Sequence, residues 1–429
     1  MAALGALAIS IVSAPIVLPI AGATVLAGAL MASSVMIRYR HVIFYLTFAP
    51  ILGAIGIPVG CKPFKEFEPR THEWGRLYYD DNKKPILELT NNDPEKMGIA
   101  QGYILGESIE EVAFDVIGPL RFFSSLLCGD YSGKRLREGL KKVVIPEPFL
   151  KEIKGLAKGY KQFCQEKGRP FYDFTDDIIL AHKLLDIYKS IGCRKIFGLP
   201  FYNNIGCTTI VQKKGDDMLV TRNLDWPSLD RAGRNMIEKR YFAPDGRKII
   251  VHTFPGVIHD LTAKSDRGLE VIINELGTTS VGGTPYGLIA REVIENCDSV
   301  ASAEEYLKTH LPASSCHLTV VDRKTAANFQ FHVDKVKPVI IRRLKENEAL
   351  VVANHALDEN GKVISGSEAS ITSHMRFRKA TSAAKKGKSQ ARIAKAANVM
   401  ETVGVVLSKN MQWRTFSGDY YAARFATNA

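Results

Sequence analysis

The sequence lacks any pairing of cysteines that would indicate a metal site or a redox motif. Its seven cysteines include no Cys-x-x-Cys, and no cysteine–histidine run has the spacing of zinc ligands. The pattern therefore indicates neither a metal nor a disulfide framework, and no cofactor is implied. Each cysteine has to be interpreted individually, as a buried side chain or as a reactive thiol.

Charge is missing from residues 2–37, and it is missing again from residues 42–60. Arg38 and Arg40 lie between the two runs, each of which is long enough to cross a bilayer. We predict that residues 1–61 form a hydrophobic membrane hairpin with its basic turn in the cytoplasm. The rest of the chain would then be membrane-associated on the non-cytoplasmic side.

The same stretch allows a signal or anchor sequence instead of a hairpin. A start at Met36 would place basic residues ahead of the apolar run 42–60, as in a signal peptide. The run ends in Ile57-Pro-Val-Gly-Cys61, which resembles a lipid-attachment sequence except for its proline, and Cys61 would carry the lipid. A buried pair of core helices is the least favoured interpretation, because the stretch is terminal and almost free of polar groups.

The remaining composition is that of a globular protein. The chain has 429 residues, of which 46% are hydrophobic and 24% charged, and its net charge is +12. This charge suits an anionic membrane surface or anionic substrates. The lysines are scattered and no nucleic-acid module is present, so we expect no nucleic-acid partner. The one dense basic run, residues 378–388, is typical of a solvated loop.

The stretch from Gly206 to Pro227 has the pattern of a β-hairpin. Two short β-branched or apolar runs flank Lys213-Lys-Gly-Asp-Asp217, which has turn chemistry. Antiparallel pairing brings the start of the first strand beside the end of the second. The residues at these two ends are Cys207, Arg222 and Asp225.

A thiol at the start of this hairpin needs a base, and the hairpin contains no histidine. Cleavage between Gly206 and Cys207 would free an α-amine with a pKa of about 8, which could activate its own thiol. Gly206 has no side chain to obstruct attack on its carbonyl. The alternative is that Cys207 is simply a small buried hydrophobe.

The run Cys207-Thr-Thr-Ile-Val, followed by Arg222-Asn-Leu-Asp-Trp-Pro227, resembles the cysteine N-terminal-nucleophile (Ntn) hydrolases. These include choloylglycine hydrolases, penicillin V acylase, acid ceramidase, N-acylethanolamine amidase and the acyl-CoA:6-aminopenicillanate acyltransferases. The resemblance implies self-cleavage before Cys207, followed by attack of its thiol on an acyl carbonyl. It also implies that Arg222 and Asp225 hold the amine and the substrate.

Upstream of the hairpin, residues 62–206 are predicted to form a mainly helical pro-segment or alpha chain. Proline after Asp93 marks a helix start, and residues 146–167 have an amphipathic stripe. Two glycine-containing stretches, Pro94–Gly102 and Glu152–Gly159, resemble the acyltransferase branch.

Downstream, residues 207–429 are predicted to form the catalytic domain, the beta chain after self-cleavage. Strands precede and follow two helices at 285–296 and 301–309, and a further helix is predicted at 389–407. The pattern fits an α+β fold, an αββα Ntn sandwich in which two sheets lie face to face between helices.

Four downstream residues are candidates through the resemblance. Asn274 follows a glycine turn and an apolar strand, which implies a role in the oxyanion hole or in substrate binding, with Glu275 as a second candidate. The pair Asn354-His355, followed by Ser373-x-x-Arg376, resembles the acyltransferase branch. It implies that Asn354 donates its amide to the oxyanion and that Arg376 supports the site. Strand-end or turn asparagines and a surface arginine are the alternatives. His355 receives no catalytic role, because the amine is the base.

We therefore predict a self-processing cysteine amidohydrolase that cleaves a linear amide, an N-acyl amine or a ceramide-like lipid amide, through a Cys207 thioester. Its partners would be the amide or lipid substrate, the membrane, and its own two chains after cleavage. Four alternatives remain: an acyltransferase with an amine acceptor, a papain-like enzyme pairing Cys207 with His317, a membrane-anchored binding protein, and a cleaved but inactive relative. The papain-like alternative is disfavoured because its cysteine would begin a helix.

Overall fold

The computed structural model describes residues 66–81, 83–112, 134–187, 206–226, 236–277, 282–333, 339–364, 371–388, 416–417 and 421–425. All of them belong to one compact unit, formed by residues 62–406 and 413–429. The predicted membrane hairpin of residues 1–61 and the predicted helix at 389–407 lie outside the described residues. Within the described ranges, no helix combines the length and apolarity that crossing a bilayer requires.

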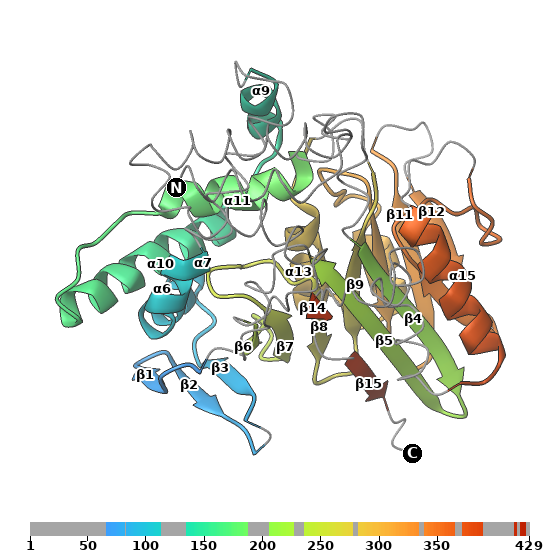
Figure 1. Cartoon of the computed structure of the whole chain (residues 1–429), viewed down its shortest axis with the longest axis horizontal. Helices are drawn as coiled ribbons and strands as arrows, with labels where there is room; N and C mark the ends of the chain where they lie inside the picture. The colour runs from blue at the N-terminus through green and yellow to red at the C-terminus, as the bar shows by residue number, and fades with distance from the viewer. Residues whose placement is uncertain are drawn as a thin grey trace, which may run out of the picture. The chain divides into compact units, whose positions relative to one another are not determined.

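The predicted hairpin forms the centre of a five-stranded sheet (Figure 1). Its two strands are β4 (Gly206–Lys214) and β5 (Asp217–Trp226), joined by a turn in which Gly215 has a φ of 62°. β13 (Ala349–Val352) pairs with the outer side of β4. The other side of β5 carries β14 (Phe416–Ser417) and β15 (Tyr421–Phe425).

A larger, ten-stranded sheet is antiparallel except where β3 pairs with β6 in parallel. Its strands, in spatial order, are β1 (Arg70–His72), β2 (Gly75–Tyr79), β3 (Pro85–Leu89), β6 (Ile237–Phe242), β7 (Lys248–Thr253), β8 (Thr262–Ser265), β9 (Glu270–Glu275), β10 (Cys316–Val321), β11 (Ala326–Phe331) and β12 (Val339–Arg343). The three strands that precede the hairpin in the chain therefore complete one edge of a sheet built from residues that follow it.

The small sheet is buried on both faces because consecutive side chains of its strands, which point to opposite faces, are apolar. On one face, Val211, Val220 and Leu350 pack against side chains of the large sheet such as Ile272 and Val321. On the other face, a second cluster joins the sheet to helix α15 (Ile371–Lys385): Ile210, Val351, Ala380, Ala383 and Ala384. The period of two along each strand thus directs one set of residues to the partner sheet and the other to a helix.

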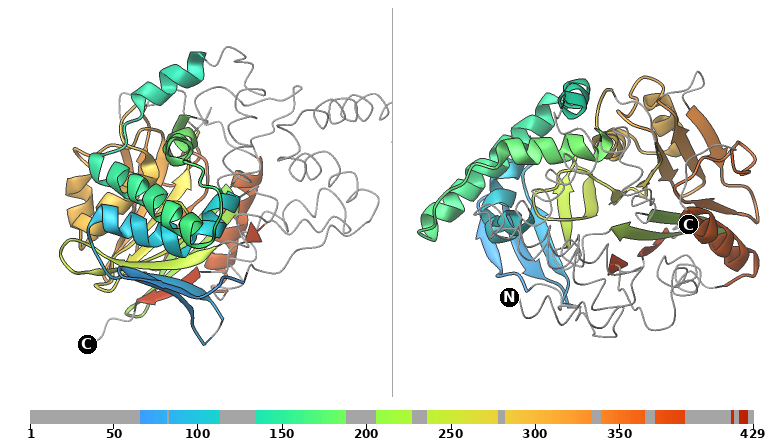
Figure 2. Two further views of the ribbon diagram at one scale, coloured as in Figure 1. Left: turned by 90° about the vertical axis from the view of Figure 1, so that its left-hand side faces the viewer. Right: turned by 45° about the horizontal axis from the view of Figure 1, so that its top comes forward.

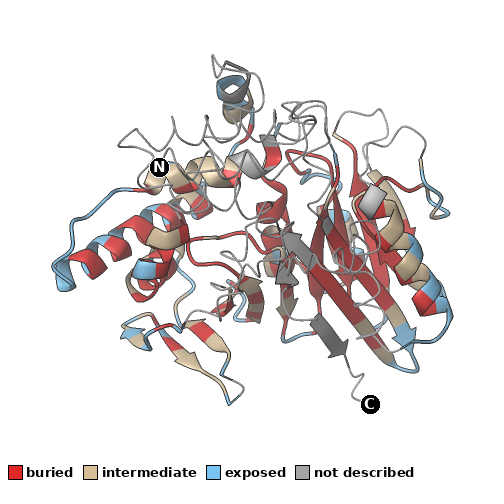
Figure 3. Cartoon of the chain, in the orientation of Figure 1, coloured by how far each residue is buried: buried red, intermediate tan, exposed pale blue. Residues whose placement is uncertain are grey.

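Helices α13 (Tyr286–Asn296) and α14 (Val300–Tyr306) cover the opposite face of the large sheet. Their buried residues, including Leu288 and Val293, join the main core with residues such as Val271 and Leu318. The order of layers is helix, sheet, sheet, helix, and burial is concentrated between them (Figure 3). The predicted mixed class of helix and sheet is confirmed.

The segment before the hairpin becomes helical after residue 93, with helices α6 (Pro94–Ile104), α7 (Gly106–Val112), α9 (Lys134–Lys142), α10 (Glu147–Glu166) and α11 (Thr175–Ile187). Helices α6 and α10 lie side by side in both views of Figure 2. Glycines bring their backbones into contact: a Cβ at Gly98 would lie 2.0 Å from the Glu152 carbonyl oxygen, and one at Gly159 would lie 2.0 Å from that of Ile99. The two glycine-containing stretches are therefore required by helix packing.

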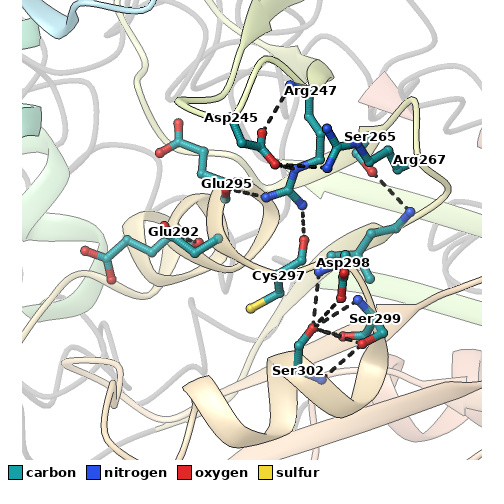
Figure 4. A network of polar contacts seen from close by, with 12 residues as sticks. Asp245, Arg247, Ser265, Arg267, Glu292, Glu295, Cys297, Asp298, Ser299 and Ser302 are labelled. Atoms are coloured by element: carbon teal, nitrogen blue, oxygen red, sulfur yellow. Dashed lines mark hydrogen bonds and ion pairs between the residues drawn. The ribbon is translucent and has the colours of Figure 1, made fainter.

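The C-terminal end of α13 is tied to the turn between β6 and β7 by a buried arginine (Figure 4). Arg247 donates to the carbonyl oxygens of Glu295, at 2.6 Å, and of Cys297. Its Nε lies 2.7 Å from the Asp245 carboxylate. A cation at the last carbonyls of a helix satisfies acceptors that have no intrahelical donor. This contact fixes α13 against the large sheet.

One expectation for the C-terminal region was wrong. The basic run 378–388, predicted to be a loop, is helical as far as Lys385, and the helix α15 begins at Ile371. The physical reason is the alanine face described above, which is buried against the small sheet while Arg378 and other charged residues face solvent. Charge density alone had concealed this amphipathic pattern. As a result, Ser373 and Arg376 lie on a helix that contacts the strand of Cys207.

Candidate active site

The register of the hairpin gathers the predicted site residues at one end of the small sheet. Gly206 pairs with Asp225, Cys207 with Leu224, and Thr209 with Arg222. Cys207 is 5% exposed, and its Sγ lies 3.5 Å from Nη2 of Arg222. The predicted proximity of Cys207 and Arg222 is therefore present. For Asp225 only the backbone is described, opposite the Gly206–Cys207 bond.

Arg222 is a buried cation held mainly by neutral oxygens. Its Nη1 donates to the Leu261 carbonyl at 2.7 Å and to the Thr262 hydroxyl, and its Nη2 donates to the Ile273 carbonyl at 2.7 Å. These contacts fix the guanidinium so that one nitrogen faces the sulfur. The arrangement supplies positive charge at the point where an attacking thiolate carries negative charge.

Asn354 holds the backbone nitrogen of Cys207. That N–H donates to Oδ1 of Asn354 at 2.8 Å. Cys207 lies at the start of β4, and Asn354 follows the end of the neighbouring strand β13. The Asn354 nitrogen Nδ2 donates to the Glu275 carbonyl at 2.9 Å. An amide NH₂ has two hydrogens, so Asn354 keeps a second N–H with no partner among the described residues. Asn354 can thus hold the Cys207 nitrogen and still donate once.

Arg376 connects three parts of the site from helix α15. It is fully buried, and its Nη1 donates to the Cys207 carbonyl at 2.5 Å and to the Thr208 hydroxyl at 2.8 Å. Its Nη2 donates to Asn354 Oδ1 at 2.8 Å. The planar guanidinium fixes the distance between the Cys207 backbone and the Asn354 amide. The surface-arginine alternative is excluded by this burial.

Asn274 lies between the two sheets rather than on open space. Its Oδ1 accepts from the Thr209 hydroxyl at 2.7 Å, and its Nδ2 donates to the Val352 carbonyl at 3.3 Å. Glu275 is half-buried, and its carbonyl is the acceptor for Asn354 described above. Both residues are therefore adjacent to the site. The oxygen and the nitrogen of the Asn274 amide are both used in hydrogen bonds to neighbouring strands.

The nearby histidines are buried and neutral. Burial, followed by the charge of Arg342, lowers the pKa of His317 to about 3, and burial followed by His374 lowers that of His355 to about 3. His317 uses Nε2 on the His355 carbonyl, while Nδ1 lies 3.2 Å from the amide of Asn328. His317 is thus engaged away from Cys207, and Cys207 begins a strand. The papain-like alternative has no support in this geometry.

Comparison with known proteins gives one match to a protein family. The sequence model of the family described as acyl-coenzyme A:6-aminopenicillanic acid acyl-transferase matches residues 211–403. The resemblance to the cysteine Ntn hydrolases is confirmed. The matched residues include Arg222, Asn274, Asn354 and Arg376, and they begin four residues after the predicted Ntn nucleophile.

Two solved structures of Ntn hydrolases share a remote likeness with the chain. The Caenorhabditis elegans N-acylethanolamine-hydrolyzing acid amidase ortholog is 14% identical, with a TM-score of 0.35 over 51% of this chain and 99% of that one. A variant of the conjugated bile acid hydrolase from Clostridium perfringens is 10% identical, with a TM-score of 0.30 over 44% of this chain and 79% of that one. No curated protein matches the sequence. Neither TM-score is high enough to establish a shared fold.

Sequence reasoning assigned no role to two side chains that contact these site residues. Thr208 gives Arg376 a second acceptor, and Ser373 accepts the Asn354 backbone N–H at 2.8 Å and contacts His355 Nδ1 at 2.8 Å. Ser373 and Arg376 are three residues apart, so both point to the same side of α15. This spacing could have indicated a role for Ser373 beside Arg376, once the helix was known to begin at Ile371.

Proposed function

We propose that the chain is a self-processing cysteine amidohydrolase with Cys207 as both nucleophile and, through its α-amine, general base. The observation that carries this proposal is the pair of contacts at Cys207: its nitrogen is bound by Asn354 and its sulfur by Arg222. Cleavage at Gly206 would turn that nitrogen into an amine without moving it from its acceptor. The nucleophile and its base would then share one fixed residue.

Maturation begins with attack of the Cys207 sulfur on the Gly206 carbonyl carbon. The peptide C–N bond breaks, a thioester forms between Gly206 and the sulfur, and the freed α-amine takes up the thiol proton. Water then hydrolyses the thioester, which leaves a carboxylate on Gly206 and a free thiol on Cys207. Arg376 supports this step by holding the Cys207 carbonyl, so that the backbone stays fixed while the preceding bond opens.

Turnover follows the same chemistry on a substrate amide. The amine accepts the thiol proton, the sulfur adds to the substrate carbonyl, and the amine returns the proton to the leaving nitrogen. Water, activated by the same amine, then releases the acyl group from the thioester. The second N–H of Asn354 is suited to the oxyanion, and a single donor of this kind contributes about 3 kcal/mol in other enzymes.

The substrate class we propose is a linear amide, an N-acyl amine or a ceramide-like lipid amide. Two features support a lipid: the net charge of +12, which suits an anionic surface, and the uncharged N-terminal runs that predict membrane association on the non-cytoplasmic side. We propose no metal or cofactor step, since an amine base and a thiol suffice for the reaction.

The decisive test is denaturing electrophoresis of the purified full chain, wild type beside Cys207→Ala. We expect two fragments from the wild type, the second beginning at Cys207, and one intact chain from the variant. Incubation at acidic pH is included, because maturation can need a trigger. An intact wild-type chain under all conditions, with no turnover of an N-acyl amine, would remove the proposal.

Acyl transfer is the second candidate, and the match to an acyltransferase family favours it. The same thioester would react with an amine instead of water, and a new amide would form. Mass spectrometry of the products with an acyl-thioester donor and a primary amine separates the two functions. A free acid as the main product supports the hydrolase, and a new amide supports the transferase.

A further inference from the structure

Three residues form one row across the large sheet and face the small sheet. Asn274 on β9 pairs with His317 on β10, and His317 pairs with Gln330 on β11. All three side chains are fully buried. Polar side chains at such positions are costly unless they are hydrogen-bonded, so their partners explain their presence.

Every member of this row binds the backbone of one short segment, residues 352–357. Asn274 Nδ2 donates to the Val352 carbonyl at 3.3 Å, and His317 Nε2 donates to the His355 carbonyl at 3.2 Å. Gln330 binds Leu357 at both ends, accepting its N–H at 2.8 Å and donating to its carbonyl at 2.9 Å. The three attachment points lie on both sides of Asn354 in the chain.

The middle contact depends on the protonation of His317. A carbonyl oxygen only accepts, so Nε2 must carry the ring's proton. The opposite nitrogen, Nδ1, lies 3.2 Å from Oδ1 of Asn328, and two acceptors cannot share a hydrogen bond. Turning the Asn328 amide over places its NH₂ at Nδ1 and its oxygen at the Thr319 hydroxyl, 3.1 Å away, and this satisfies both contacts. Burial, followed by the charge of Arg342 on β12, lowers the pKa of the ring to about 3 and so disfavours a second proton. The ring therefore stays a neutral donor to the His355 carbonyl through the ordinary pH range.

We propose that His317 and Gln330 are positioning residues that, together with Asn274, set the place of Asn354 relative to Cys207. The inference rests on the proposed function, in which Asn354 Oδ1 holds the reacting amine. A shift of Asn354 of about 1 Å would misdirect both the amine and the N–H that faces the oxyanion, and such shifts cost on the order of 100-fold in rate. The three side chains thus affect the reaction through the backbone of residues 352–357, without touching the substrate themselves.

The test compares His317→Leu, His317→Gln and Gln330→Met in the full chain. Leucine removes the donor, whereas glutamine can present an amide N–H near the former position of Nε2. We expect His317→Leu and Gln330→Met to slow self-cleavage and lower kcat for a fluorogenic N-acyl amide by roughly 10-fold to 100-fold. KM should change by less than about threefold, and His317→Gln should recover most of the rate.

His182→Leu is the matched control. It makes the same substitution at another buried histidine, whose hydrogen bonds go to the backbones of Ile178 and Ile258 and not to residues 352–357. We expect it to lower the unfolding midpoint about as much as His317→Leu while leaving kcat near the wild-type value. Equal loss of rate in both variants, at equal loss of stability, would overturn the positioning role.

A second readout follows the amine itself. Loss of the Asn354 acceptor destabilises the protonated amine, so the acid limb of the kcat/KM profile should move to lower pH in His317→Leu and not in His182→Leu. The side-chain amide resonances of Asn354, observed by NMR with labelled asparagine, report its position even in a chain that never cleaves. An inactive wild type with shifted Asn354 resonances in His317→Leu would reject the proposed function and keep the positioning role. Unshifted resonances would reject the positioning role.

Discussion

Arg376 illustrates how much of the site depends on one side chain. It joins Cys207, on the first strand of the hairpin, to Asn354, in the segment after β13. The two residues are 147 positions apart in the sequence. All three of its acceptors in this contact are neutral oxygens. In this contact the guanidinium positions the two segments, because it bridges two acceptors that a smaller cation could not reach together.

Arg376→Lys is expected to slow self-cleavage by roughly 10-fold to 100-fold, because an ammonium cannot hold both the Cys207 carbonyl and the Asn354 amide. The rate is followed by the disappearance of the intact chain on a denaturing gel. Arg378→Lys, an exposed position on the same helix, is the matched control and should cleave at the wild-type rate. Equal rates in all three chains would contradict the role assigned to Arg376.

Stability should depend on pH through the buried His317. Its pKa is about 3 in the folded chain and about 6.5 when unfolded, so the unfolded state binds more protons below pH 6.5. The stabilisation is present above pH 6.5 and is lost as the pH falls toward 3, by on the order of 1 kcal/mol per pH unit. Urea unfolding at pH 7, 6 and 5 measures this loss. The His317→Gln chain, which has no imidazole there, should lose less over the same range.

At the scale of elements, helices α6 and α10 pack so closely that their contact positions leave no room for a side chain. A Cβ at Gly102 would lie 2.1 Å from the Leu156 carbonyl oxygen and 2.9 Å from the Tyr160 nitrogen, both of them backbone atoms. Helices in such contact can accommodate a methyl group only by moving apart, because backbone atoms cannot turn away as a flexible side chain can.

Gly102→Ala is accordingly expected to lower the free energy of unfolding by about 2–4 kcal/mol, despite the better helix propensity of alanine. Gly282→Ala is the matched control, since a Cβ there would meet no atom within 4 Å. Denaturant titration of both chains supplies the comparison. A Gly102→Ala chain as stable as the control would mean that the two helices do not need their close contact.

Local chemistry was sufficient to predict some elements and not others. The hairpin was predictable because β-branched runs flank a glycine turn, and α13 because its apolar residues recur with helical spacing. β8 was missed, since Thr262-Ala-Lys-Ser265 has neither alternation nor an apolar run. The parallel pairing of β3 with β6 joins residues far apart in sequence, and no local pattern encodes it.

The candidate site divides in the same way. The proximity of Cys207 and Arg222 follows from hairpin register, which sequence supplies. His317 and Gln330 were not identifiable as positioning residues, because polar alternation in a strand normally predicts a solvent face. Here both faces of β10 and β11 are buried, and the polar face lies between two sheets. The polar face of these strands is buried by the second sheet, and a local sequence pattern does not show that a second sheet is present.

At the scale of the whole described unit, the segment before Cys207 is held to the segment after it by buried polar contacts. Glu152 of α10 lies 2.6 Å from Arg291 of α13, and both side chains are almost fully buried. Asp186 of α11 accepts from the Ser314 hydroxyl at 2.6 Å. Together with the β3–β6 pairing, these contacts cross the proposed cleavage point without including it.

The two fragments are therefore expected to remain together after self-cleavage. Size-exclusion chromatography of the matured protein should give one peak containing both fragments, eluting where the Cys207→Ala chain elutes. Denaturant should separate them. A matured sample that divides into two peaks in native buffer would show that the contacts across the cleavage point do not hold the fragments together.

The parallel pairing of β3 with β6 has a consequence for how the molecule responds to dilution. In the intact chain these strands belong to one molecule, so their association is independent of protein concentration. After the cut the same ladder joins two molecules, and its formation obeys mass action. The unfolding temperature of the matured protein should rise with concentration while that of the Cys207→Ala chain stays constant. Maturation would thus change the molecularity of folding while leaving every contact in the sheet unchanged.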